Sequence, residues 1–90
     1  MVILTQPTDQ TVALHGTCTF TVVAANVTAY QWQYQAPGKT NWTNSSLAGN
    51  KTAKLRVAAT ESRNGGKYRC VVVDEEGVVA TSYGATLTVR

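Results

Sequence analysis

The sequence predicts an all-β fold, either a sandwich or a barrel. Apolar and polar residues alternate along several short runs, and no segment has the apolar spacing of an amphipathic helix. The runs are rich in valine, threonine and aromatic residues, which favour strands. Turn-forming stretches such as Ala36-Pro37-Gly38-Lys39 and Asn64-Gly65-Gly66 separate the runs at short intervals. This spacing predicts antiparallel strands rather than an alternation of strands and helices.

Each run presents one apolar face, which we expect to point into the core, because successive side chains of a strand point to opposite sides. Segment 58–64 follows the third run, and we interpret it as a loop that links two strands. In order along the chain, the residues expected to point inward are Cys18, Phe20 and Val22 in 17–24; Tyr30, Trp32 and Tyr34 in 29–35; Ala53, Leu55 and Val57 in 52–57; Tyr68, Cys70 and Val72 in 67–74; and Ala85, Leu87 and Val89 in 81–89.

Length and composition indicate a single domain over residues 1–90. Charged residues make up only 14% of the chain, and the net charge of +3 is too small to indicate a nucleic-acid partner. No apolar run approaches the ~20 residues of a membrane span, so direct membrane insertion is not expected. The chain also opens without a signal peptide. We therefore expect a module of a longer multidomain protein, with neighbouring domains of the same chain as partners.

The two cysteines, Cys18 and Cys70, favour a disulfide over a metal site. The chain has no Cys-x-x-Cys pair and one histidine, His15, whereas zinc sites take four Cys or His ligands, or three and an open position. A disulfide indicates an oxidising, extracellular compartment. His15 lies at a predicted turn without a nucleophile to serve, so the sequence predicts no enzyme activity and no cofactor.

Four residues in register on alternating strands resemble the immunoglobulin fold. Cys18, Trp32 and Cys70 have the same inward parity, and Tyr68 stands two residues before the second cysteine. Immunoglobulin domains have an inter-sheet disulfide packed on a tryptophan, and a corner tyrosine whose hydroxyl bonds to nearby backbone. Asn64-x-Gly66-x-Tyr68-x-Cys70 is similar to the family's Asp-x-Gly/Ala-x-Tyr-x-Cys, with asparagine in place of aspartate.

The resemblance implies a Greek-key sandwich of about seven to eight strands with one inter-sheet disulfide, Cys18–Cys70. It also implies a structural core that contains Trp32, Tyr68, Phe20, Leu55 and Leu87. The stretches 6–24, 30–34, 38–44, 67–77 and 85–89 are most similar to Ig-like repeats of bacterial surface or secreted proteins. In those repeats the position of Cys18 is often a small residue. At this position the chain differs from them and resembles the immunoglobulin domains that have the disulfide.

This resemblance implies a non-catalytic extracellular or cell-surface unit that acts as a spacer or in adhesion and protein binding. The alternative is a recognition domain for a host or cell-surface protein or a glycan, either accessory to a carbohydrate-active enzyme or in a eukaryotic receptor. Trp42 and Tyr83 are the candidate binding residues, because exposed aromatic rings stack on sugars, although Trp42 also suits a packed hairpin position.

Other polar features have simpler interpretations. Lys54 and Arg56 fall on one predicted strand and Lys67 and Arg69 on another, in opposite sheets, so they do not form one basic stripe. The acidic run 74–76 is interpreted as a solvated hairpin turn, and nearby valines as a possible contact with a neighbouring domain. Glycosylation sequons, relevant only in a eukaryote, are Asn26, Asn41, Asn44 and Asn50.

Overall fold

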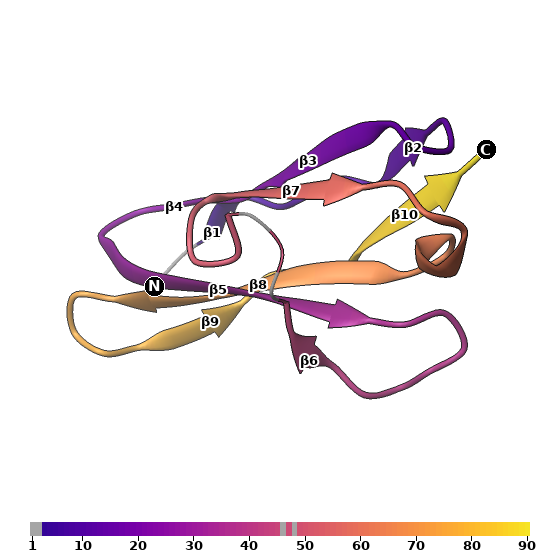
Figure 1. The fold of residues 1–90 in the computed structure, drawn as a ribbon. Helices are drawn as coiled ribbons and strands as arrows, with labels where there is room; N and C mark the ends of the chain where they lie inside the picture. Colours follow the sequence, from indigo (N-terminus) through magenta and orange to yellow (C-terminus); the bar gives the residue numbers. More distant parts are fainter. Residues whose placement is uncertain (1–2, 46, 48) are drawn as a thin grey trace.

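Two layers of β-strands pack face to face (Figure 1). The computed structural model describes residues 3–45, 47 and 49–90. Over these residues the elements are β1 (Ile3–Thr5), β2 (Gln10–Val12), β3 (Thr17–Thr21), β4 (Val23–Ala24), β5 (Val27–Gln35), β6 (Thr43–Asn44), β7 (Lys54–Ala58), the 3-10 helix η1 (Glu61–Arg63), β8 (Lys67–Asp74), β9 (Val79–Thr81) and β10 (Ala85–Val89).

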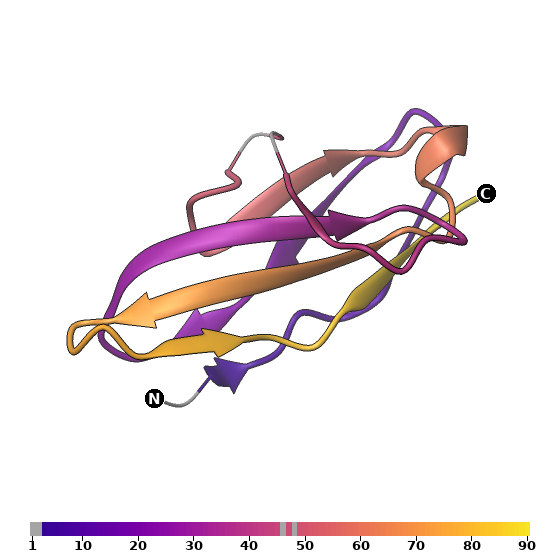
Figure 2. The same cartoon turned by 90° about the horizontal axis from the view of Figure 1, so that it is seen from below.

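The first layer contains β1, β3, β4 and β7, in which β3 pairs with β7 and β1 with β4, both antiparallel. The second layer has the strand order β2-β10-β8-β5-β6, and β9 also pairs with β8 (Figure 2). Its long central pair is β5 with β8, in continuous register from Ala29 opposite Val73 to Gln35 opposite Lys67, with a register shift between Val27 and Ala29. The chain changes layer five times, between β1 and β2, β2 and β3, β4 and β5, β6 and β7, and β7 and β8, so the two layers share one core.

The predicted two-layer all-β sandwich is confirmed, but the described residues form ten strands instead of seven to eight. The additional strands come from interruptions that alternation alone does not reveal. Buried Pro7 lies between β1 and β2, which join different layers, and proline lacks the N–H that a ladder needs. The last strand is broken at Ser82–Gly84, so that β9 and β10 pair with successive parts of β8.

The core consists of the inward faces that the alternation predicts. Five side chains assigned to the core, Trp32, Phe20, Leu55, Leu87 and Tyr68, are at most 1% exposed. The Trp32 indole N–H donates to the Thr52 carbonyl at 2.7 Å, so the one polar atom of this side chain has a partner. Segment 58–64, expected as a loop, includes the short helix η1.

The sandwich measures 41 × 23 × 19 Å between Cα atoms. The chain ends beside the β2–β3 turn and η1, while β1 and the β8–β9 hairpin lie toward the other end (Figure 1). Within the described residues, no helix has the length and apolar character needed to cross a membrane.

Candidate functional site

Cys18 on β3 and Cys70 on β8 enter the same core from opposite layers. Both are buried, and Cys70 lies opposite Trp32 in the β5–β8 ladder. Burial raises the pKa of Cys70 to about 11, opposed by a backbone hydrogen bond from Gln31, and it also raises the pKa of Cys18. Both are free cysteines in the structure, so the predicted disulfide is not formed there. In the folded, reduced chain the two thiols are therefore protonated at neutral pH.

Tyr68 lies in the core at the predicted corner, but its hydroxyl does not have the role that the resemblance implies. Its ring packs between Phe20 and Tyr34, with centroid distances of 5.1 and 4.9 Å. The hydroxyl is buried without a hydrogen-bond partner among the described residues. Burial raises its pKa above the ordinary range, and the nearby Tyr34 raises it further. The prediction that this hydroxyl donates a hydrogen bond to nearby backbone is therefore wrong for the described residues.

Asn64 holds the corner instead. Its side-chain oxygen accepts from the Val89 N–H at 3.0 Å, which ties η1 to β10. The Gly65 N–H donates to the Leu87 carbonyl at 2.7 Å, and the Leu87 N–H donates to Gly66 at 2.8 Å. A Cβ on Gly66 would stand 2.6 Å from the Tyr34 ring, so only glycine fits there. The motif located this corner, but the sequence does not show which side chain makes the bond.

Trp42 lies on the outer face of the second layer, just before β6. It is partly buried, and the Arg69 guanidinium carbon is 4.3 Å from its ring centroid. Arg69 also donates to the Gln33 side chain at 2.8 Å, and Gln33 in turn donates to Asn44 at 3.2 Å. A Cβ on Gly84 would stand 3.2 Å from the indole edge, so the ring reaches across to the β9–β10 segment. Trp42 thus packs on a sheet face, in a setting of side-chain amides.

Tyr83 is 74% exposed, and its backbone N–H donates to the Gln6 side chain at 2.9 Å. The described residues show no contact between the rings of Tyr83 and Trp42. Tyr83 immediately precedes Gly84, whose Cβ position lies 3.2 Å from the Trp42 ring, so the two candidate binding residues belong to neighbouring segments without stacking on each other.

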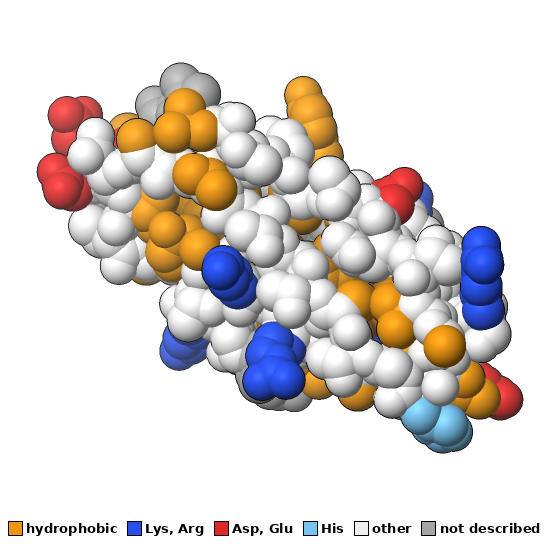
Figure 3. Space-filling model, turned by 90° about the horizontal axis from the view of Figure 1, so that it is seen from above, with side chains coloured by type: hydrophobic (Ala, Val, Ile, Leu, Met, Phe, Trp, Pro, Cys, Tyr) orange, Lys and Arg blue, Asp and Glu red, His pale blue; other side chains and the backbone are white. Residues whose placement is uncertain are grey.

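The basic side chains are divided between the two layers, as expected. Lys54 and Arg56 belong to β7, whereas Lys67 and Arg69 belong to β8 in the other layer. Figure 3, a view onto the layer of β3 and β7, shows separate blue side chains in a largely white surface. The described part of the chain also contains no group of three or more His, Cys, Asp or Glu side chains arranged to hold a metal ion. His15 is exposed in the β2–β3 turn with a φ of 71°.

The sequons differ in accessibility. Asn26 and Asn41 are exposed, while the Asn50 amide donates to the Ser45 carbonyl at 2.6 Å and is committed to the fold. Asn44 is exposed and paired with Gln33, but the hydroxyl residue of its sequon, Ser46, lies outside the described residues.

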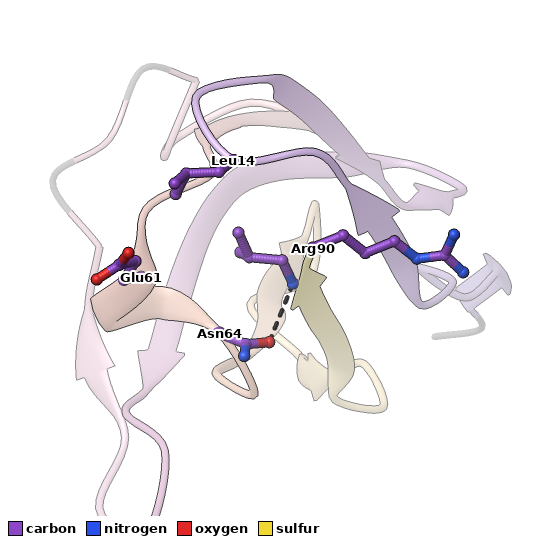
Figure 4. Close-up of a pocket in the computed structure, with 5 residues that line it drawn as sticks. Leu14, Glu61, Asn64 and Arg90 are labelled. Atoms are coloured by element: carbon purple, nitrogen blue, oxygen red, sulfur yellow. Dashed lines mark hydrogen bonds between the residues drawn. The ribbon is translucent and has the colours of Figure 1, made fainter.

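The end of the molecule where the chain leaves carries a cavity of about 220 Å³. We call this end the exit pole; it comprises the β2–β3 turn, the β5–β6 loop, η1, the start of β8 and the end of β10. Leu14 and Val89 provide apolar walls, and the Leu14 N–H donates to the Arg90 carbonyl at 3.0 Å. Figure 4 shows the Arg90 side chain extending away from the cavity, on the side opposite Glu61.

The opposite end, which we call the hairpin pole, consists of the β4–β5 turn and the β8–β9 hairpin. The Asp74 carboxylate accepts from the N–H groups of Glu76 and Val78, both at 2.9 Å, which closes the hairpin turn. The Glu75 N–H donates to the Asn26 carbonyl at 3.0 Å, which joins the two turns. Val78 and Val79 are 46% and 60% exposed next to this acidic turn.

No family model matches the chain. The sequence is similar to Endoglucanase C of Cellulomonas fimi, with 35% identity over 81 residues, which is 90% of this chain and 7% of that protein. The fold is similar to solved fibronectin(III)-like modules of Clostridium thermocellum CbhA, with a TM-score of 0.56, 9% sequence identity, and coverage of 98% of this chain and 93% of that one. At that identity the structural likeness shows the fold alone.

Proposed function

We propose that this chain is a non-catalytic, extracellular spacer module of a longer secreted bacterial protein, accessory to domains that act on carbohydrate. The observation that carries the proposal is the placement of the two chain ends along a 41 Å sandwich. Because β1 lies toward one end and the end of β10 lies at the other, each folded copy would add length between its neighbours.

The similarity to Endoglucanase C supports the accessory role. The chain spans 7% of that protein's length, which leaves most of that protein to other segments. The fibronectin(III)-like fold supports the same view, because it comes from modules of a larger protein. Adhesion to another cell or to a host protein would be a further use of such a spacer.

The cysteine pair is the second part of the proposal. Cys18 and Cys70 lie in one core cluster and come from opposite layers. Outside the cell we propose that they oxidise to the inter-sheet disulfide, which would fasten the two layers of a small domain to each other.

A fluorescence-transfer experiment tests the spacer role. With a donor domain fused before residue 1 and an acceptor after residue 90, transfer should stay constant with added urea and then fall in one cooperative step. The fall is expected because the folded radius of gyration is 12.7 Å, whereas an unfolded chain of this length has about 30 Å. A Gly/Ser linker of equal length is the control. A gradual change from the first addition of urea would contradict a rigid spacer.

A second candidate function, glycan recognition, is favoured by one observation. Trp42 is partly exposed on a sheet face that also carries the amides of Gln33 and Asn44, and rings with neighbouring amides suit sugar rings and hydroxyls. Sedimentation with an insoluble glucan separates the two functions. A spacer stays in the supernatant, whereas a binder sediments and loses binding in Trp42→Ala. Tyr83→Ala tests the second candidate binding residue, and both variants are first checked for an unchanged melting temperature.

A further inference from the structure

The two poles of the molecule carry opposite charge. Three of the five acidic residues, 74–76, form the hairpin turn at one pole. The exit pole has a single acidic residue, Glu61, and several basic ones. The basic residues there are Lys39 in the β5–β6 loop, Arg63 in η1, Lys67 at the start of β8, and Arg90 at the end of β10. Opposite charges on opposite ends favour association of one end with the other.

The poles also match in their apolar surface. The hairpin pole projects Val78 and Val79, which directly follow the acidic turn and are largely exposed. The exit pole offers a cavity of about 220 Å³, with Leu14 and Val89 in its wall and with Glu61, Asn64 and Arg90 as its polar lining. An apolar projection beside carboxylates on one end therefore matches a partly apolar recess on the other end, where basic residues outnumber the single carboxylate of Glu61.

We propose that the exit pole of this chain binds the acidic β8–β9 hairpin of a second copy, so that copies joined end to end form a stiff head-to-tail array. In this arrangement Val78 or Val79 of the following copy enters the recess between Leu14 and Val89, and its Glu75 and Glu76 approach Arg90. The inference rests on the proposed spacer function and adds the partner and the contact.

The size of the contact decides when it forms. The end face measures about 23 by 19 Å, roughly 440 Å² per copy, whereas stable complexes of separate proteins bury about 800 Å² per partner. Separate copies should therefore associate only weakly. A short covalent connection raises the effective concentration into the millimolar range, where a small complementary contact suffices. The contact joins two different surfaces, so it extends into a chain of copies and does not close a dimer.

The test uses two complete copies of the 90-residue sequence joined in one chain, compared with the single copy by ¹⁵N relaxation. Docked copies should tumble together, with a correlation time about twice that of the single copy. Amide shifts should change at residues 74–79 of the second copy and around Leu14 of the first. Raising the salt from about 20 mM to about 0.5 M should move the correlation time toward the single-copy value, because salt screens the charges.

Charge reversal provides the matched variants. Glu75→Lys with Glu76→Lys in the second copy should uncouple the tumbling, and Arg90→Glu with Lys39→Glu in the first copy should restore it. Lys54→Glu with Arg56→Glu, on β7 away from both poles, should leave the tumbling coupled. Each variant is also made as a single copy, to verify an unchanged melting temperature.

Copies that tumble independently at low salt, with shift changes confined to the junction, would overturn the array contact. That outcome would leave the spacer role intact, because each copy would still be folded and would still add its length. Loss of the cooperative transition in the urea experiment would instead remove the spacer role itself.

Discussion

At the scale of single residues, the corner between η1 and β8 contains the tyrosine that the immunoglobulin resemblance implies, but another side chain makes its hydrogen bond. Tyr68 is in the place that the immunoglobulin resemblance implies, and its ring is buried as expected. The hydrogen bond at this corner comes from Asn64, which accepts from Val89, while the Tyr68 hydroxyl has no partner in the described part of the chain. The two side chains should therefore respond to truncation in opposite directions.

Tyr68→Phe should raise the free energy of unfolding by about 1 kcal/mol, because it removes a buried hydroxyl that lacks a hydrogen bond. Asn64→Ala should lower it by about 1 kcal/mol, because it leaves the Val89 N–H without its acceptor. Urea denaturation followed by tryptophan fluorescence measures both. A loss of 1 kcal/mol or more in Tyr68→Phe would mean that the hydroxyl does bond to the corner.

The sequence predicts residue positions better than residue partners. Parity along the strands placed Phe20, Trp32 and Leu87 in the core correctly, because burial depends only on which face a side chain occupies. Hydrogen bonds depend on distances between segments far apart in sequence, as between Asn64 and Val89. Trp42 shows the same difference between position and partners. The sequence left open whether its ring is exposed or packed, and only the fold shows that it lies beside Arg69 and Gly84.

At the scale of elements, residues 49–53, which lead into β7, are held closely against the core. The backbone N–H of Trp32 donates to the Asn50 carbonyl at 2.8 Å, and the Thr52 hydroxyl donates to the Lys54 carbonyl at 2.8 Å. Gly49 lies in this segment with a φ of +83°, and a Cβ there would overlap the Lys54 carbonyl oxygen. Gly38, in the β5–β6 loop, has a similar φ of +74° but open space around it.

Gly49→Ala should lower the free energy of unfolding by about 3 kcal/mol, through a left-handed backbone and a clash with a carbonyl oxygen. Gly38→Ala is the matched control, because it introduces the same backbone strain without the clash, and should lower it by about 1 kcal/mol. The difference between the two midpoints in urea isolates the clash. Equal losses would show that this segment moves aside at little cost.

Strand boundaries could be predicted less well than strand identity. Alternation in 67–74 and 29–35 located β8 and the main part of β5, the longest pair in the fold. It did not reveal the break at Ser82–Gly84, where the Ser82 hydroxyl accepts from the Cys70 N–H at 2.7 Å in place of a regular ladder. In the sequence, a serine that accepts a hydrogen bond from the backbone of the adjacent strand cannot be distinguished from a serine that faces solvent.

At the scale of the whole molecule, the two cysteines determine how the free energy of unfolding depends on pH and redox state. The pKa of Cys70 is raised from 9.0 to about 11 in the folded chain, and that of Cys18 is raised as well. The unfolded chain therefore releases thiol protons at a pH where the folded chain keeps them. Folding is favoured below the unfolded pKa, and this contribution is lost as the pH rises through the folded pKa.

The reduced chain should have a free energy of unfolding that is flat up to about pH 8 and then falls by about 2–3 kcal/mol toward pH 11 through Cys70. The oxidised chain should be about 4 kcal/mol more stable at neutral pH, because its crosslink closes a long loop, and it should lack the thiol contribution to the slope. Tyr68 titrates in both forms, so the difference between the two curves isolates the thiols. If the two curves of unfolding free energy against pH were parallel, the thiols would not be the source of the pH dependence.

The strand pairing at the exit pole determines how the fold responds to tension on its two ends. Because β2 runs parallel to β10, with Gln10 beside Leu87 and Val12 beside Val89, a pull on the two chain ends draws these strands along each other in opposite directions. The ladder is then loaded in shear, and its hydrogen bonds must break together rather than one after another. A copy of this fold that is loaded through its two ends would thus resist extension chiefly through this pair of strands.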